Sequence, residues 1–282
     1  ERTYFLKPCG NVGQIVSFAC QYSDTKSVRK AVKNAEIVVN CNGILYEKGK
    51  SSKFKRVHVD IPAMIAKACA DEKVSRFVHI SALSCDKGTS KYAKSKLEGE
   101  KAVHSNFPSA TILRPSVVFG ADDNFFNMFA ELSRYMPFLP LIGGGKTKFQ
   151  PVYVGDVADA VIKVATDGGT MYQRKVYQLG GPDIVDFKEV YELIFKYTGR
   201  RRKLVNLPFC VAKAEATFLG LLPKPLLTRD QVESLKTDNI VEDGALGFNS
   251  LGMVPTDMDA ILPFYLEHYR AGGAIAKEQA AS

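Results

Sequence analysis

The N-terminal part of the chain alternates short apolar runs with longer segments of helical periodicity. The apolar, β-branched runs that predict strands are residues 14–20, 37–41, 76–81 and 110–113. Apolar positions at helical spacing predict helices over residues 24–32, 54–70 and 91–104, with Asp24 as the N-cap of the first. This alternation is typical of right-handed βαβ units, so we expect an α/β fold with a doubly wound parallel sheet.

The rhythm changes after Pro115, and the change predicts a second, smaller lobe. Residues 122–136 predict an aromatic-rich helix and residues 137–148 a loop. Phe125, Phe126 and Phe129 either form core or close a substrate pocket, and the pattern leaves both open. The remaining expected elements are strands at 149–154 and 176–179, helices at 156–166 and 187–197, a strand-like run at 204–207, and mainly helical chain beyond 208.

Two polar features belong to the ends of predicted helices. Thr256 with Asp259 resembles a capping box, which predicts a last helix over roughly residues 257–270. The one dense basic run, residues 200–203, follows Gly199, and we expect it to be a solvated turn at a helix end. Contact with anionic lipid or a partner protein is the less favoured interpretation of this run.

Composition describes an ordinary globular protein. The chain has 282 residues, 46% hydrophobic and 24% charged, with a formal net charge of +8. Because the basic residues are dispersed rather than clustered, we do not expect a nucleic acid partner. The longest apolar-looking stretch, residues 209–227, is interrupted by charges and Pro223, so we expect no transmembrane helix. The sequence starts at Glu1, and we expect that a segment once preceded it.

Candidate metal and phosphate motifs are weak. The six cysteines contain no C-x-x-C pair and share no ligand spacing with the histidines, so we expect reduced thiols and no metal. His58, His79 and His104 are expected to be core or surface histidines. Residues 143–147 (GGGKT) imitate the end of a P-loop, but they precede a strand and lack its first glycine, which favours a glycine-rich turn.

The most informative segment is the helix pattern SKYAKSKLEGEKAV at residues 90–103. It places Tyr92 and Lys96 at positions i and i+4, on one helix face. In such a pair the ammonium favours the tyrosinate and lowers the pKa of the phenol, which then exchanges a proton with a substrate oxygen. An isolated Tyr-x-x-x-Lys match is usually a chance pair of solvated side chains, so its context decides.

The order of elements around this pair resembles the extended and atypical short-chain dehydrogenase/reductase family, over essentially the whole chain. The resemblance implies that the turn at Asn42 and Gly43 passes beside a nucleotide and that Tyr92 and Lys96 hold its ribose. It also implies that residues 115–118 lie against the nicotinamide. The positions assigned to cofactor binding are Asn42, Gly43, Ile80, Ser81, Ala82, Tyr92, Lys96, Pro115, Ser116, Val117 and Val118.

The resemblance implies a Rossmann-type core with a smaller, mainly helical C-terminal lobe. We assign residues 1–120 and 148–180 to the core, and residues 121–147 and 181–282 to the lobe. The family's glycine-rich turn, which lets the backbone approach a pyrophosphate, has no counterpart here, because Gly10 and Gly13 lie before the third strand of the family. We therefore expect the first βα unit to be absent and the chain to begin after the second strand of the family, where NAD and NADP are normally distinguished.

A second departure concerns catalysis. Active members of the family usually place Ser or Thr directly after the position of Ser81, to hold a substrate carbonyl, but this chain has Ala82. Ser84 could replace it if the turn is shifted. Because loss of one such donor commonly lowers the rate by about a hundredfold or more, we assign no catalytic residue and treat Tyr92 and Lys96 as vestigial.

Several segments resemble one branch of the family, the short-chain-dehydrogenase-like accessory subunits of mitochondrial respiratory complex I. They are RFVHISAL, ILRPSVVFGADDNFFNMFA, QPVYVGDVADAV and LLTRDQVESLKTDNIV. The resemblance implies a bound NADPH, with NAD(H) as the weaker alternative, and other complex I subunits as partners. It also implies a peripheral position on the matrix side of the inner membrane, at the junction of the two arms, where anionic lipid is a further candidate partner.

Two other classes of function remain open at this stage. The chain could be an active reductase or epimerase that uses Tyr92 and Lys96, including a free-standing bacterial relative. A nucleotide-sensing or RNA-binding protein is the third hypothesis, which the dispersed basic residues disfavour. Apolar residues in the segments 219–223 and 225–227 either contact partners or pack on the lobe itself, and the latter is favoured.

Overall fold

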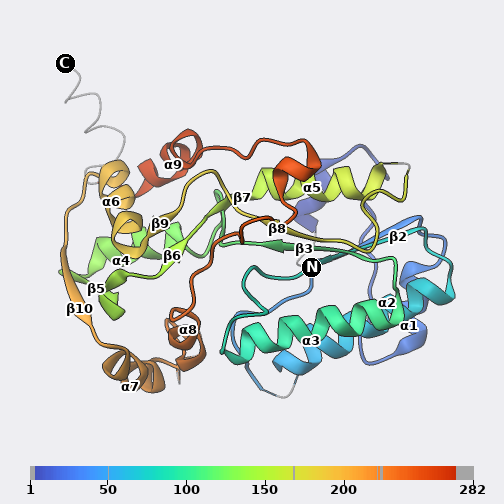
Figure 1. The fold of residues 1–282 in the computed structure, drawn as a ribbon, viewed down its shortest axis with the longest axis horizontal. Helices are drawn as coiled ribbons and strands as arrows, with labels where there is room; N and C mark the ends of the chain where they lie inside the picture. Colours follow the sequence, from blue (N-terminus) through green and yellow to red (C-terminus); the bar gives the residue numbers. More distant parts are fainter. Residues whose placement is uncertain (1–3, 50, 168, 221, 223–224, 271–282) are drawn as a thin grey trace.

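A four-stranded parallel sheet forms the centre of the larger lobe (Figure 1). The computed structural model describes residues 4–49, 51–167, 169–220, 222 and 225–270. The strands lie in the order β1 (Ile37–Asn40), β2 (Arg76–Ile80), β3 (Thr111–Pro115) and β8 (Val176–Leu179). All neighbours are parallel, so the carboxyl ends of the strands meet at one edge of the sheet.

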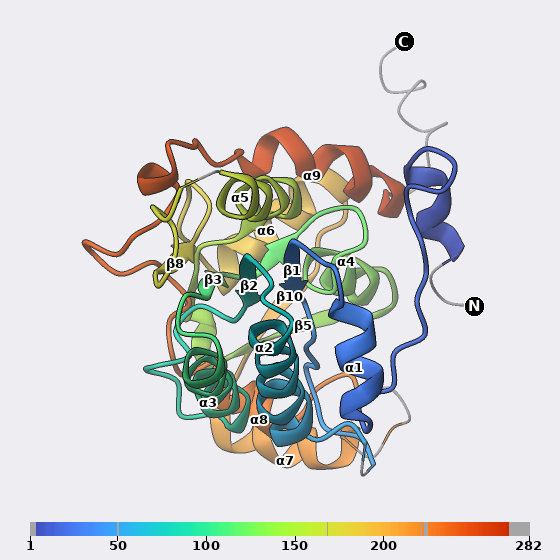
Figure 2. The same cartoon turned by 90° about the vertical axis from the view of Figure 1, so that its right-hand side faces the viewer.

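Helices cover both faces of this sheet (Figure 2). One face carries α1 (Thr25–Val32), the π-helix η2 (Lys55–Asp60), α2 (Ile61–Asp71) and α3 (Lys91–Asn106), and the other carries α5 (Val154–Thr166). Successive side chains of β2 point to opposite faces of the sheet. Phe77 is buried among residues of α1, α2 and α3, whereas Val78 is buried with residues of α5. The predicted α/β, Rossmann-type sheet is therefore confirmed.

The strand predicted at residues 14–20 is wrong. Residues 16–21 follow the 3-10 helix η1 (Tyr4–Cys9) and a turn, without regular structure, and Val16 and Phe18 are 76% and 52% exposed. A β-branched run forms a strand only where a neighbouring strand pairs with its backbone. In the described part of the chain no strand pairs with this run, and Figure 2 shows it passing outside the edge formed by β1.

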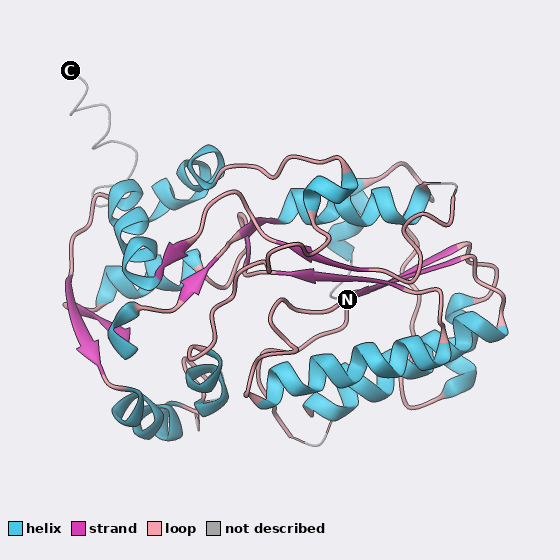
Figure 3. Ribbon diagram, viewed as in Figure 1, coloured by secondary structure: helices cyan, strands magenta, loops and turns pink. Residues whose placement is uncertain are grey.

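The smaller lobe, whose helices and short strands are seen beside the central sheet in Figure 3, has an aromatic core. It combines α4 (Phe126–Tyr135), α6 (Phe187–Thr198) and α9 (Met258–Leu266), together with the pair β6 (Lys148–Phe149) and β9 (Val185–Asp186). Phe126 and Phe129 are buried against residues such as Tyr191, and Phe125 packs partly buried on them, so all three belong to this core.

Two predictions for the segment 137–154 need correction. The expected loop contains β5 (Phe138–Ile142), which pairs in parallel with β10 (Lys203–Leu207). The single strand expected at 149–154 is instead divided between β6 and β7 (Val152–Tyr153), and β7 pairs with β4 (Val118–Phe119). The turn predicted at residues 143–147 is confirmed as the 3-10 helix η3 (Gly143–Gly145), whose glycines all have positive φ.

The C-terminal part is less helical than expected. It contains α7 (Phe209–Leu219), α8 (Arg229–Ser234), the 3-10 helices η4 (Phe248–Leu251) and η5 (Glu267–Tyr269), and long irregular connections. The capping box expected from Thr256 is wrong, because its hydroxyl and backbone N–H both donate to Asp156, and Asp257 caps α9 instead. Gly199 does end α6 in the left-handed conformation before the basic turn.

Some expectations fall on residues outside the description. The apolar segments 219–223 and 225–227 include residues 221, 223 and 224, and the residues after Gly272 also lie outside the described residues. Among the residues that the structure does describe, no helix has both the length and the apolar character needed to span a membrane.

Candidate functional site

The predicted site residues meet at the carboxyl edge of the sheet, where the chain leaves β1, β2 and β3. Lys96 reaches this edge from α3, and its Nζ donates to the backbone oxygen of Ile80 at 3.3 Å. A Cβ atom on Gly43 would lie 3.4 Å from the same Nζ, so the turn after β1 passes directly over the ammonium group. The structure thus brings the turn after β1, the end of β2 and Lys96 together.

The start of α3, which carries Tyr92 and Lys96, is fixed by two sets of hydrogen bonds. Ser90 caps the helix, its Oγ accepting from the backbone N–H of Ala93 at 3.1 Å. The carboxylate of Asp230, at the start of α8, accepts from the backbone N–H groups of Lys91 and Tyr92 at 2.7 and 2.9 Å. Sequence reasoning missed Asp230, because nothing local links it to a helix more than a hundred residues earlier.

Burial controls the ionisation of both predicted site residues. It lowers the pKa of Lys96 from 10.5 to about 8, although the acidic groups of Cys85, Glu100 and Cys41 oppose this shift. Burial also raises the pKa of Tyr92 to about 12, with a further contribution from Cys85. The predicted lowering of the phenol pKa by the ammonium is therefore wrong, because desolvation of the tyrosinate dominates.

The turn at residues 42–44 is held from below by a buried asparagine on β1. The Oδ1 atom of Asn40 accepts from the backbone N–H of Asn42 at 3.1 Å and from its side-chain amide at 2.7 Å. The Nδ2 atom of Asn40 donates in turn to Nδ1 of His79, on β2, at 3.0 Å. These bonds place the turn beside the end of β2 without a residue of the turn being buried.

The residues after β2 leave no hydroxyl in the family's carbonyl-binding position. Ser81 is buried, and its Oγ lies 4.0 Å from the Sγ of Cys85. Ala82 has no polar side chain. Ser84 has a positive φ of 57°, and its Oγ donates to the backbone oxygen of Asp238 at 2.9 Å, so it does not supply the missing donor.

A C-terminal segment closes the loop at residues 115–118. Ser116 donates through its Oγ to the side chain of Asn239 at 2.5 Å, and the Asn239 amide donates to the backbone oxygen of Leu83 at 3.4 Å. Val117 accepts at its backbone oxygen from Val152 at 3.0 Å, which continues the contact between β4 and β7. Sequence reasoning missed Asn239 as well, since it lies 123 residues from Ser116.

Beneath the loop that follows β2 lies a buried ionic network. Arg114, on β3, makes a bidentate pair with Glu100 of α3, at 2.9 and 2.8 Å, and a further bond to Asp86 at 2.6 Å. The thiol of Cys85 donates to the same Glu100 at 3.3 Å. Both partners of the bidentate pair are less than a tenth exposed, so the network fixes α3 to the sheet below Lys96.

The arrangement has unused donors where a nucleotide ribose would lie. Lys96 makes a single hydrogen bond within the described residues, although an ammonium group carries three donors. The Tyr92 hydroxyl makes none within the same residues, and its ring packs on Phe54 and His58. Because ribose hydroxyls accept hydrogen bonds, these residues fit the sugar of a dinucleotide. Within the described part of the chain no cluster of His, Cys, Asp or Glu is arranged for a metal ion.

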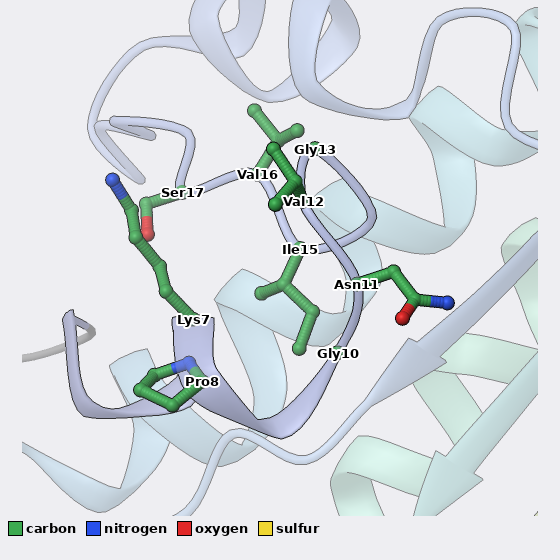
Figure 4. Close-up of a pocket in the computed structure, with 9 residues that line it drawn as sticks. All are labelled: Lys7, Pro8, Gly10, Asn11, Val12, Gly13, Ile15, Val16 and Ser17. Atoms are coloured by element: carbon green, nitrogen blue, oxygen red, sulfur yellow. The ribbon is translucent and has the colours of Figure 1, made fainter.

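A separate hollow on the described surface lies elsewhere. It has a volume of about 610 Å³ and is lined only by residues between Lys7 and Ser17 (Figure 4). Side chains of Val12, Ile15 and Val16 line it, and none of the predicted site residues does. The candidate site is therefore defined by the polar groups at the sheet edge and not by this hollow.

Solved structures with the same arrangement of elements include nicotinamide-dependent reductases. An NADPH-dependent quinone oxidoreductase from Escherichia coli, complexed with NADPH, superposes with a TM-score of 0.71 at 18% identity, over 91% of this chain and 84% of that one. A Citrobacter triphenylmethane reductase complexed with NADP(H) superposes with a TM-score of 0.73 at 17% identity, over 94% and 88%. At this level of identity, the likeness establishes the fold.

Sequence comparison is more specific. The profile of a family described as RmlD substrate binding domain matches residues 11–216. The mitochondrial NADH dehydrogenase (ubiquinone) 1 alpha subcomplex subunit 9 of Arabidopsis thaliana is 34% identical over 95% of this chain and 69% of its own length. The mouse protein of the same name is 35% identical over 90% of this chain and 67% of its own length. The 40 kDa subunit of NADH-ubiquinone oxidoreductase from Neurospora crassa is 30% identical over 94% of this chain and 70% of its own length. The chain therefore belongs to the RmlD-like short-chain dehydrogenase/reductase family and, within it, to the family of these complex I subunits.

Proposed function

We propose that this protein is an NADPH-binding accessory subunit of mitochondrial complex I that does not itself catalyse a reaction. The observation that carries the proposal is the identity of 34% to a complex I subunit over 95% of the chain. A likeness that extends over both lobes indicates a shared role, whereas a shared Rossmann core alone would indicate only a shared fold.

The carboxyl edge of the sheet supports the cofactor part of the proposal. Tyr92 and Lys96 would hold the nicotinamide ribose, and the turn at Asn42 and Gly43 would lie against the same nucleotide. The positions Ile80, Ser81 and Ala82 would line its nicotinamide side, together with the loop at residues 115–118. When bound, NADPH would supply a hydride donor, and these residues would orient it.

Three features favour a structural rather than a catalytic role for the nucleotide. Ala82 offers no hydroxyl to a substrate carbonyl, and Ser84 bonds to Asp238 instead. Burial raises the pKa of Tyr92 to about 12, which makes the phenol a poor proton donor or acceptor near neutral pH. Together these features predict slow turnover even where NADPH is bound.

The relatives also suggest the setting of the protein. We propose a peripheral position on the matrix side of the inner membrane, with other complex I subunits as partners, at the junction of the two arms. Anionic lipid is a further candidate partner, and nucleic acid is not proposed. The division into a nucleotide-binding core, residues 1–120 and 148–180, and a lobe, residues 121–147 and 181–282, is kept as part of the proposal.

The test is a native purification of the full-length protein from mitochondria, followed by identification of bound nucleotide and co-purifying proteins. We expect NADPH and complex I subunits in the same fraction. A partner-free protein that exchanges nucleotide rapidly would contradict the structural role.

The retained Tyr92 and Lys96 pair favours a second candidate, an active NAD(P)-dependent reductase or epimerase. Screening of carbonyl and sugar-nucleotide substrates against the wild type and Tyr92→Phe separates the two functions. Turnover that is lost in Tyr92→Phe would support catalysis, whereas a nucleotide that stays reduced with every substrate would support the structural role.

A further inference from the structure

Two histidines are completely buried beneath the proposed nucleotide turn. His58 is 1% exposed and His79 is 0% exposed, and each contacts the chain between Asn40 and Ile44. His79 acts indirectly, since it accepts from Asn40, which holds Asn42. His58 contacts the turn itself through Ile44, and its other ring nitrogen contacts Ser95 on α3, the helix that carries Tyr92.

The hydrogen bonds of His58 determine its tautomer. The backbone N–H of Ile44 donates to Nε2 at 3.0 Å, so Nε2 carries no proton. The Oγ of Ser95 donates to the backbone oxygen of Tyr92 at 2.7 Å, so it can only accept from Nδ1 of His58, 2.8 Å away. The proton of the neutral ring therefore lies on Nδ1. One directed chain of donors runs from the turn through His58 and Ser95 to the Tyr92 backbone.

The groups around His58 keep it neutral and in place. Phe54 stacks on its ring at 5.2 Å, and the Tyr92 ring packs edge-on at 5.4 Å. Burial lowers the pKa of His58 to about 4, with a smaller contribution from the nearby charge of Lys96. From α3, Gly99 allows the close approach, since a Cβ atom there would lie 1.9 Å from the backbone oxygen of His58. His79 interacts electrostatically with His58 and is neutral for the same reason, since burial lowers the pKa of His79 to about 3.

The π-helix explains how the ring reaches both partners. η2 contains the wider turn of a π-helix, a form that occurs mostly as short insertions in α-helices and often at functional sites. His58 lies within it, directly before α2. An insertion of this kind rotates a side chain relative to the helix that follows, which here directs the imidazole between the turn and α3.

We propose that His58 is a positioning residue, which ties the turn at residues 42–44 to the Tyr92 helix through its Nδ1-protonated ring and so holds Gly43 beside Lys96. The inference deepens the proposed function, since it names the residue that aligns the two halves of the nucleotide site. It predicts that the turn loses its position when the Nε2 acceptor is removed, even if the ring itself remains.

The test compares variants of the full-length protein in which individual hydrogen bonds of His58 are removed or restored. His58→Phe keeps a ring against Phe54 but removes both hydrogen bonds, whereas His58→Gln restores an acceptor for Ile44. Ser95→Ala removes only the Nδ1 side and serves as a milder variant if His58→Phe does not fold. His104→Gln, at the opposite end of α3, is the matched histidine control.

Three readouts are needed. Nitrogen NMR of the wild type should show His58 with an unprotonated Nε2. Hydrogen exchange of the Ile44 amide should become at least about tenfold faster in His58→Phe, as expected for loss of its hydrogen bond. The increase in the exchange rate should be smaller in Ser95→Ala. In His58→Gln and His104→Gln the rate should stay near that of the wild type. The Kd for NADPH should rise about tenfold in His58→Phe and recover in His58→Gln.

A protonated Nε2 in the wild type, or an Ile44 amide whose exchange is unchanged in both His58→Phe and Ser95→Ala, would overturn the inference. The proposed function fails in a different way, because it fails if the wild-type protein does not bind NADPH at all. In that case the tautomer and the Ile44 exchange still decide whether His58 ties the turn to α3.

Discussion

Helices α3 and α6 pack against their lobes in opposite ways. α6 buries an apolar face of Phe187, Val190, Tyr191 and Ile194, and its neighbours are aromatic rings. α3 also buries one face, but that face contains Ser95, Lys96 and Glu100. A buried charge is expensive unless it is paired, so α3 is positioned by specific partners where α6 is positioned by shape.

The difference marks where function lies. Every buried polar group of α3 has a bond that leads to the sheet edge: Lys96 to Ile80, Ser95 to His58, and Glu100 to Arg114. The polar groups of α6 are mostly at its surface, in pairs such as Lys188 with Glu192. Polar groups buried together at one end of a sheet are costly for folding, which is the pattern expected where a ligand is held.

Breaking the ionic network of α3 should have the largest effect. Arg114→Met leaves Glu100 buried without a cationic partner, and we expect a loss of about 3–5 kcal/mol in the free energy of unfolding. Chemical denaturation measures this loss. The double variant Arg114→Met with Glu100→Met should recover most of it, because no fully buried charge is then left unpaired, and the Asp86 side chain is 34% exposed to water. Equal losses in the single and double variants would contradict the assignment of the cost to an unpaired charge.

The corresponding change in α6 should act through a cavity. Ile194→Ala removes a fully buried side chain from the aromatic core, and we expect a loss of about 2–4 kcal/mol. Urea denaturation measures the loss, and NADPH affinity measured in parallel should stay unchanged. A large fall in NADPH affinity would show that the two lobes are not as independent as the comparison implies.

The pH dependence of stability should separate α3 from α6 again. Burial lowers the pKa of Lys96 from 10.5 to about 8, so between these pH values the unfolded chain binds a proton that the folded chain does not. The stability of the wild type relative to Lys96→Met should therefore rise with pH in this window, by on the order of 2 kcal/mol. Unfolding at pH 7.5 and pH 10 measures it. Parallel pH curves for the two proteins would refute the lowered pKa.

The smallest differences concern the helix caps. Asp186 caps α6 through a capping box with Glu189, and Asp186→Ala should cost about 1 kcal/mol. Ser90 caps α3, but Asp230 accepts from the next two N–H groups, so Ser90→Ala should cost less, about 0.5 kcal/mol. Thermal unfolding checks both. A larger loss in Ser90→Ala would mean that Asp230 does not share the capping of α3.

The sequence by itself determined the elements that carry their own signals. Strands β2, β3 and β8 were predicted from short apolar runs between turns, and α3 was predicted from its helical periodicity. These signals are local, so the order of strands and helices could be predicted, and with it the family. The meeting of Asn42, Ser81 and Lys96 at one edge was implied by the family resemblance, and the parallel order of the strands accounts for it.

Other features were decided only by the tertiary structure, because they depend on groups far apart in the chain. The run at residues 14–20 has strand propensity but no partner strand, whereas Phe138–Ile142 becomes a strand because β10 pairs with it. Asn239 reaches Ser116 across 123 residues. The pKa of Tyr92 is set by burial rather than by its neighbour in sequence. Propensity describes what a segment can form, and pairing, burial and charge compensation decide what it does form.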